Sequence, residues 1–185
     1  KNYLRRYDDL DHWHIGRSLN TIDCLMALTR RIECDEPAFF ESMAKYAEDD
    51  TEQHSYLRSW LEVAVMARNK LKHAFATCPW SDFYATGQIL KLVPRDWHLQ
   101  LSNGTAVRYA QLFDYSAFES IECNRGVSGI DGSTSTAIGS HIDFGGVTLL
   151  LTGDMSAQYD IGALALGEIT PRFKMAVLNN SGGGI

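Results

Sequence analysis

The sequence predicts an α/β protein with a doubly wound, mainly parallel sheet and helices on both faces, preceded by the tail of another α/β domain. Two patterns favour this fold. Short apolar runs alternate with stretches of helical spacing over short connections, which is typical of parallel sheets. Each later apolar run also stops at glycine beside a small polar residue, and in open α/β sheets this edge is where ligands bind.

The first 53 residues differ from the rest of the chain. We expect Trp13-His14-Ile15 to be extended, and Glu36-Pro37 to open a short helix that reaches Tyr46, because proline suits the start of a helix. The acidic run at 48–52 predicts a solvated linker. We therefore expect a domain boundary here, which separates residues 1–53 from a second domain, 54–185.

From Ser55 to Phe75 apolar residues recur at three- and four-residue steps, which predicts a helix. Ser81 and Asp82 can cap a second helix that Pro94 ends. Strands and helices then alternate. The predicted strands are 97–101, 118–123, 147–152 and 174–178, and the predicted helices between them are 105–113, 133–142 and 157–168.

Composition narrows the class of protein. The formal net charge is −6, which argues against a nucleic-acid or anionic-membrane surface, and no apolar stretch is long enough to span a bilayer. The four cysteines form no CxxC pair, so we expect reduced thiols in a cytoplasmic protein, with two disulfides as the alternative. Because the chain lacks an initiator Met and stops just after a strand, we expect a piece of a longer polypeptide.

Four predicted strand exits share one chemistry. They read Ser102-Asn103-Gly104, Asn124-Arg125-Gly126, Gly153-Asp154 and Asn179-Asn180-Ser181-Gly182. In a parallel sheet these turns meet at one edge, where a carboxylate from Asp154 and a carboxamide from Asn180 supply hard oxygens suited to Mg²⁺. The chain has no GxxxxGK[ST] and no GxGxxG after a strand, so the usual nucleotide sites are disfavoured. The turns therefore predict a phosphate and Mg²⁺ site.

These motifs resemble those of known enzymes. Gly153-Asp154, followed 26 residues later by Asn180, is similar to the signature of thiamine-diphosphate enzymes. Residues 124–139, NRGVSGIDGSTSTAIG, resemble the menaquinone-pathway 2-succinyl-5-enolpyruvyl-6-hydroxy-3-cyclohexene-1-carboxylate synthases, the MenD family. So do residues 153–160, GDMSAQYD, and the closing NNSGGGI. The likeness is strongest over residues 97–185 and implies a thiamine-diphosphate-binding fold. Residues 1–53, around Trp13-His14, resemble the C-terminal tail of this family's central domain.

The resemblance implies roles for particular residues. It assigns Mg²⁺, or Mn²⁺, to Asp154, Asn180 and the Gly182 carbonyl. It assigns binding of the diphosphate to the turn residues. Ile130 matches the apolar residue that holds the two cofactor rings in a bent conformation. Family members often carry Ser at the position of Gly104, and Met155 stands where other thiamine-diphosphate enzymes often have Gly. The implied cofactor-binding residues are Asn103, Gly104, Ile130, Gly153, Met155 and Ser156.

The family reaction decarboxylates 2-oxoglutarate and adds the resulting succinyl carbanion to isochorismate, which makes the whole enzyme a transferase. Arg125 and Arg108 match the arginines that receive the substrates' carboxylates. Arg108 falls in the first turn of a predicted helix, where a cation opposes the helix dipole and so suggests a role. We expect Asp131 to cap the helix that begins near Ser133.

No catalytic residue is assigned within the chain, because the family's activating glutamate comes from the N-terminal domain of a neighbouring subunit. We therefore expect the chain alone to be inactive and the whole protein to be a homodimer or tetramer. Two alternatives stay open: another thiamine-diphosphate 2-oxo-acid decarboxylase or acetolactate-type synthase, and a non-catalytic cofactor-binding module.

Overall fold

The structure is a computed structural model that describes residues 2–7, 9–18, 22–46, 51–114 and 118–182. It divides into two compact units, Lys1–Trp60 and Leu61–Ile185. Each unit is described by itself below. The four cysteines are free thiols.

The first unit contains a small parallel sheet. Strand β1 (His12–Ile15) pairs with β2 (Leu28–Ile32), with a register shift after His12. A 3-10 turn, η1 (Leu4–Arg6), precedes the sheet, and helix α1 (Glu36–Ala44) follows it. The extended segment and the helix opening at Glu36 are thus confirmed, although α1 ends two residues before Tyr46. The unit is α/β, as expected.

Helix α2 (Thr51–Thr77) is one continuous helix of 27 residues. It runs through position 53, where the sequence suggested a domain boundary, and the contacts divide the chain further along, after Trp60. Part of the acidic run lies outside the described residues. The assignment of 1–53 and 54–185 to two domains therefore stays a prediction.

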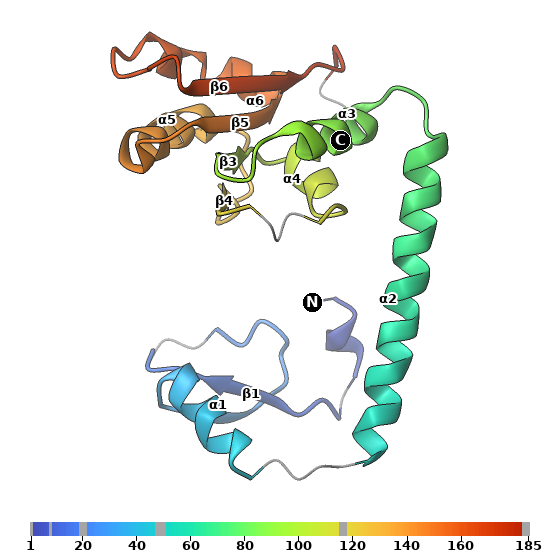
Figure 1. Ribbon diagram of the computed structural model, residues 1–185. Helices are drawn as coiled ribbons and strands as arrows, with labels where there is room; N and C mark the ends of the chain where they lie inside the picture. The colour runs from blue at the N-terminus through green and yellow to red at the C-terminus, as the bar shows by residue number, and fades with distance from the viewer. Residues whose placement is uncertain (1, 8, 19–21, 47–50, 115–117, 183–185) are drawn as a thin grey trace. The chain divides into compact units, whose positions relative to one another are not determined.

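The second unit is built on a four-stranded parallel sheet (Figure 1). Its spatial order is β4-β3-β5-β6, so the chain begins near the middle, steps to one edge and then crosses to the other side. The strands are β3 (His98–Leu101), β4 (Ser120–Cys123), β5 (Thr148–Gly153) and β6 (Phe173–Leu178). All three pairings are parallel, which confirms the predicted doubly wound α/β fold.

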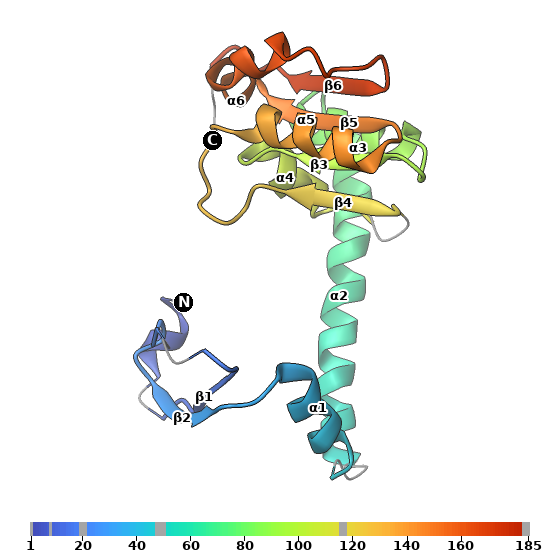
Figure 2. The same cartoon turned by 90° about the vertical axis from the view of Figure 1, so that its left-hand side faces the viewer.

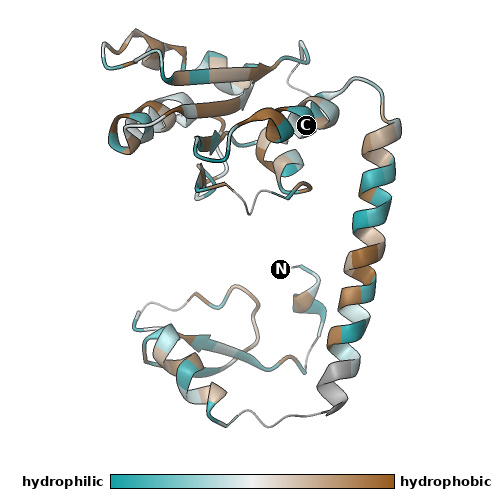
Figure 3. Cartoon of the chain, viewed as in Figure 1, coloured by the Kyte–Doolittle hydropathy of each residue, from teal (hydrophilic) through white to brown (hydrophobic). Residues whose placement is uncertain are grey.

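Helices cover both faces of this sheet (Figure 2). Leu99 and Leu151 point to the face covered by α3 (Asp82–Leu92) and α4 (Thr105–Ala110), where they join Leu90 and Val107 in the buried core. This alternation follows from the two-residue period of a strand. Figure 3 shows a strongly apolar part of β5, whose centre consists of three leucines, residues 149–151.

The opposite face, covered by α5 (Ser133–Phe144), is unusually polar. His98 is 1% exposed, and its Nδ1 lies 2.7 Å from Ser120 Oγ, while its Nε2 lies 2.9 Å from Gln100 Nε2. Because a carboxamide nitrogen can only donate, His98 Nε2 accepts and Nδ1 carries the proton. The histidine is therefore neutral, and burial lowers its pKa, opposed by the nearby Glu122 carboxylate.

Close packing of α2 on α3 depends on a glycine. A Cβ at Gly87 would collide with the rings of Phe75 and Phe113, which themselves pack edge to face with centroids 5.2 Å apart. The first turn of α3 is capped as predicted, since Ser81 Oγ accepts the Tyr84 N–H at 3.3 Å. The helix ends at Leu92, just before Pro94, which confirms the predicted stop.

Two helix predictions are wrong in extent. The single helix predicted at 157–168 is instead a short α6 (Asp154–Tyr159) and a 3-10 helix, η2 (Ile161–Ala165). The chain leaves helical geometry at Asp160, whose carboxylate bonds to α5 instead. Helix α4 ends at Ala110 and not at Phe113. Among the described residues no helix is long and apolar enough to cross a membrane.

The core makes a direct stability prediction. Leu99 is fully buried between the sheet and its helices. Leu99→Ala should lower the free energy of unfolding by about 2–5 kcal/mol, because it removes buried methyl groups and leaves a cavity. Urea unfolding measures this. Val127→Ala, at a side chain that is 94% exposed, is the control and should change stability little; equal losses in both variants would contradict the packing described.

The neutral His98 predicts a dependence of stability on pH. Its pKa is lowered in the folded state, so the unfolded chain binds the proton more tightly. Stability should be complete above the ordinary histidine pKa of about 6.5 and decline as the pH falls below it. Urea unfolding at pH 7.5 and 5.5 tests this. His98→Asn should reduce the difference between the two pH values, and an unchanged difference would exclude His98 as a source.

Candidate functional site

The strand register brings the four polar turns to one edge of the sheet. Gly153 pairs with Leu178, so Asp154 and Asn179-Asn180 leave neighbouring strands at the same level. Leu101 pairs with both Cys123 and Leu151, which aligns the exits of β3 and β4 with that of β5. The edge predicted from the sequence therefore exists, and it is the carboxyl edge where open α/β folds bind ligands.

Asp154 is the first residue of α6 and is partly buried. Its Oδ1 accepts the backbone N–H of Met155 at 2.8 Å. This bond fixes the carboxylate at the start of the helix, where a negative charge suits the helix dipole. Among the described residues no protein group donates a hydrogen bond to the second carboxylate oxygen, which can therefore face a cation.

The orientation of Asn180 is set by its neighbours. Its Nδ2 donates to Asp82 Oδ2 at 3.3 Å, and its Oδ1 accepts the Gly182 N–H at 3.2 Å. Asp82 comes from the first turn of α3, 98 residues away in the sequence, and sequence reasoning assigned it only to capping. Since a carboxylate accepts and a backbone N–H donates, the amide cannot be flipped. Its oxygen thus stays on the side of Gly182.

The segment between β4 and α5 is held by side chains from other elements. Asn103 Nδ2 donates to the backbone oxygens of Asn124 and Gly129, and its Oδ1 accepts from Arg125 Nη1 at 3.4 Å. Ser156 Oγ donates to the Ile130 carbonyl at 2.6 Å. Four of the residues assigned from the sequence thus take part in the hydrogen bonds that hold this segment: Asn103, Arg125, Ile130 and Ser156.

The two arginines differ in their settings. Arg125 is exposed and lies in that hydrogen-bonded segment. Arg108 is exposed on α4, but this helix has only six residues, so Arg108 falls in its last turn, where a cation is favourable. The dipole reasoning that singled out Arg108 is therefore wrong, and only the family resemblance supports a role for it.

Three further residues assigned from the sequence, Gly104, Met155 and Gly153, have distinct surroundings. Gly104 has φ 99° and ψ −140°, a conformation that is essentially confined to glycine, so its backbone rather than a side chain meets any ligand. Met155 is 37% exposed beside Asp154. Gly153 immediately precedes α6 in extended conformation.

The start of α5 is capped from a distance. Ser135 donates its backbone N–H to Asp160 at 2.6 Å and its Oγ to the same carboxylate at 2.7 Å. The residue at the cap position itself is Gly132, which has no side chain to use, and Asp131 makes no capping bond. The predicted cap by Asp131 is therefore wrong, because the free N–H of Ser135 bonds instead to Asp160, 25 residues after Ser135.

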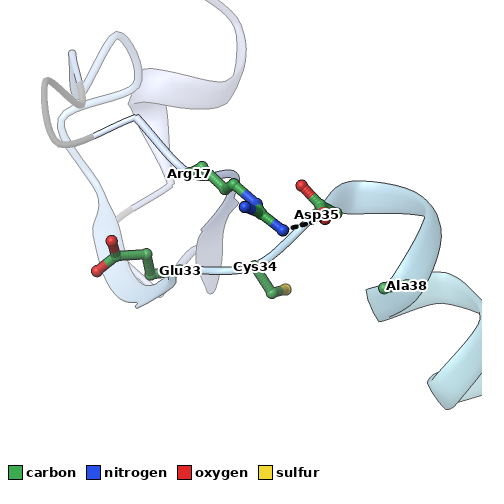
Figure 4. A pocket seen from close by; sticks show the side chains of 5 residues that line it. All are labelled: Arg17, Glu33, Cys34, Asp35 and Ala38. Carbon is green, nitrogen blue, oxygen red and sulfur yellow. Dashed lines mark hydrogen bonds and ion pairs between the residues drawn. The ribbon is translucent and has the colours of Figure 1, made fainter.

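The first unit contains a hollow of about 630 Å³ (Figure 4). Arg17 and Asp35 form an ion pair across it at 2.5 Å, with side chains 75% and 50% exposed. Glu33, Cys34 and Ala38 complete the lining. Because Arg17 and Asp35 are exposed and already pair with each other, the hollow offers a ligand little convergent chemistry.

Within the described part of the chain, no three His, Cys, Asp or Glu side chains gather to hold a metal. A cation at the sheet edge would therefore depend on Asp154 together with amide and carbonyl oxygens, a donor set that suits Mg²⁺ more than zinc. The fold therefore defines the class of open, parallel α/β proteins, and the oxygens at this carboxyl edge are of the kind that hard cations prefer.

The particular family follows from comparison with known proteins. The chain is 43% identical over 185 residues to the 2-succinyl-5-enolpyruvyl-6-hydroxy-3-cyclohexene-1-carboxylate synthase of Flavobacterium psychrophilum. It is 36% identical to the synthases of Flavobacterium johnsoniae and Porphyromonas gingivalis. Each match covers the whole chain, which confirms the resemblance to the MenD family, and the chain spans about a third of the length of these relatives. No family model matches the chain.

The distant cap yields a test that separates the two candidate residues. Asp160→Ala should lower the free energy of unfolding by about 1 kcal/mol, because it leaves the first turn of α5 without its acceptor. Asp131→Ala is the matched control and should have little effect. Urea unfolding of both variants decides between them, and a larger loss in the Asp131 variant would restore the cap expected from the sequence.

Proposed function

We propose that this chain forms the diphosphate- and metal-binding part of a thiamine-diphosphate-dependent synthase of the MenD type. The observation that carries the proposal is the parallel register of β5 and β6, which sets Asp154 and Asn180 on adjacent strand exits. Identity of 34–43% to such synthases along the whole chain supports it. The motifs at residues 124–139 and 153–160, which resemble those of the MenD family, also support the proposal.

The residues present fit a magnesium ion bound to a diphosphate. One carboxylate oxygen of Asp154 accepts the Met155 N–H, and the other remains for a cation. The Asn180 side chain is oriented by its hydrogen bonds to Asp82 and Gly182. With a Gly182 carbonyl they supply one carboxylate and two neutral oxygens, which leaves positions for phosphate oxygens and water, as Mg²⁺ usually requires. Mn²⁺ has the same ligand preference and is the second candidate.

The remaining residues would place the cofactor and its substrates. Bound thiamine diphosphate would supply the electron sink for decarboxylation of a 2-oxo acid. Ile130, partly buried at the edge, would pack against the cofactor rings, and the backbone at Gly104 and Gly153 would approach its phosphates. Arg125 would receive a substrate carboxylate, since a guanidinium binds carboxylates through two parallel bonds.

The proposed whole enzyme acts on 2-oxoglutarate and isochorismate in the cytoplasm and works as a homodimer or tetramer. The activating glutamate would come from a neighbouring subunit's N-terminal domain. Consumption of 2-oxoglutarate that requires isochorismate would distinguish this enzyme from a decarboxylase or an acetolactate-type synthase. Consumption without isochorismate would support those alternatives.

Cofactor binding by the chain itself is the first test. Calorimetry should detect thiamine diphosphate binding that needs Mg²⁺, and Asp154→Ala should weaken it at least tenfold, because the cation loses its charged ligand. Asp96→Ala removes an equal charge from an exposed position just before β3 and should leave the affinity unchanged. Binding that Asp154→Ala does not weaken would contradict the proposed metal site and favour a module of another kind.

A further inference from the structure

Residues 124–130 carry both Arg125 and Ile130, yet they belong to no helix or strand. Their backbone includes Ser128 at φ 65°, in the left-handed region that non-glycine residues seldom adopt. Because the segment is neither helix nor strand, regular backbone hydrogen bonds do not fix its conformation. Whatever fixes it also fixes where Arg125 and Ile130 lie at the sheet edge.

Asn103 supplies that restraint. It follows β3 directly and is 4% exposed. Its carboxamide has two N–H donors, and Nδ2 bonds to two carbonyls of the segment, those of Asn124 and Gly129. Its single oxygen accepts from Arg125 Nη1 at 3.4 Å. The side chain therefore has no donor left for an anion while these bonds are made.

The segment is anchored at its other positions as well. Ser156, which is 3% exposed, donates its one O–H to the Ile130 carbonyl at 2.6 Å. Asn124 Nδ2 donates to Gly132 O at 3.2 Å and lies 2.9 Å from Thr136 Oγ1, at the start of α5. Asn103 is the one of these anchors that touches the guanidinium of Arg125 as well as the backbone.

We infer that Asn103 is a positioning residue: its carboxamide clamps the 124–130 segment and thereby sets Arg125 and Ile130, and it does not bind the diphosphate through its side chain. The substrate that depends on it is the carboxylate-bearing 2-oxo acid received by Arg125. This last step rests on the proposed function, whereas the clamp itself rests on the hydrogen bonds alone.

Amide hydrogen exchange on the chain tests the clamp without any ligand. Asn103→Ala removes all three bonds, and Asn103→Asp keeps an acceptor for Arg125 but loses both donors. Two lost hydrogen bonds, each worth roughly fivefold in an equilibrium, should raise exchange in peptides covering 124–132 by about 10- to 30-fold in both variants. Thr148→Val is the matched control, because Thr148 is equally buried but bonds to His141 at the other end of β5.

A double-mutant cycle in the complete enzyme tests the consequence. Asn103→Ala and Arg125→Ala should each raise KM for 2-oxoglutarate about tenfold or more, and the double variant should be little worse than Arg125→Ala alone, since one residue acts through the other. The Kd of thiamine diphosphate should change less than threefold in Asn103→Ala. A purely structural defect would lower the amount of folded enzyme and leave KM unchanged.

The outcomes separate cleanly. Unchanged exchange at 124–132 in both Asn103 variants would overturn the clamp. A raised cofactor Kd with an unchanged KM, or additive losses with Arg125→Ala, would make Asn103 a direct ligand and overturn the inference. If the complete wild-type protein consumed no 2-oxoglutarate, the proposed function would fail, while the exchange measurement would still decide whether Asn103 holds the segment.

Discussion

Parallel pairing in one register underlies everything described at the sheet edge. Gly153 lies beside Leu178, and Leu101 lies between Cys123 and Leu151, so four exits from distant parts of the chain end at the same level. A slip of one residue between β5 and β6 would turn each side chain to the opposite face. Asp154 and Asn180 would then no longer share a site, whatever their spacing in the sequence.

Many of the described polar side chains of the second unit form hydrogen bonds within the protein, and few of them remain free to bind a ligand. Asn103 and Ser156 look like ligand-binding residues by type and position, but each donates to the protein backbone, and Asp160 caps α5 by accepting a backbone N–H. In the loops at the sheet edge, such hydrogen bonds satisfy backbone groups that would be paired within a helix or sheet elsewhere. Fewer groups would remain for the proposed ligand: Asp154, the Asn180 oxygen, Arg125 and exposed backbone groups.

Much of the fold, but less of the site, could be predicted from the sequence. Apolar runs located all four strands of the second unit, as the match of 174–178 to Phe173–Leu178 illustrates. Local patterns failed where a distant residue intervened: Asp160 ends the helix expected at 157–168 and displaces Asp131 as the cap. The contact between Asp82 and Asn180 spans 98 residues, and no local pattern contains it. The placement of Asn103 against the next loop likewise exists only once β3 and β4 have paired.

The cap that Asp160 provides for α5 has a consequence for the order of folding. The first turn of a helix is the costly step of helix formation, and here its acceptor arrives from beyond β5 and α6. The start of α5 can therefore become complete only after the strand that follows it has joined the sheet. Helix nucleation at this point is tied to long-range assembly, so α5 and the β5–α6 turn should form as one cooperative unit rather than in sequence order.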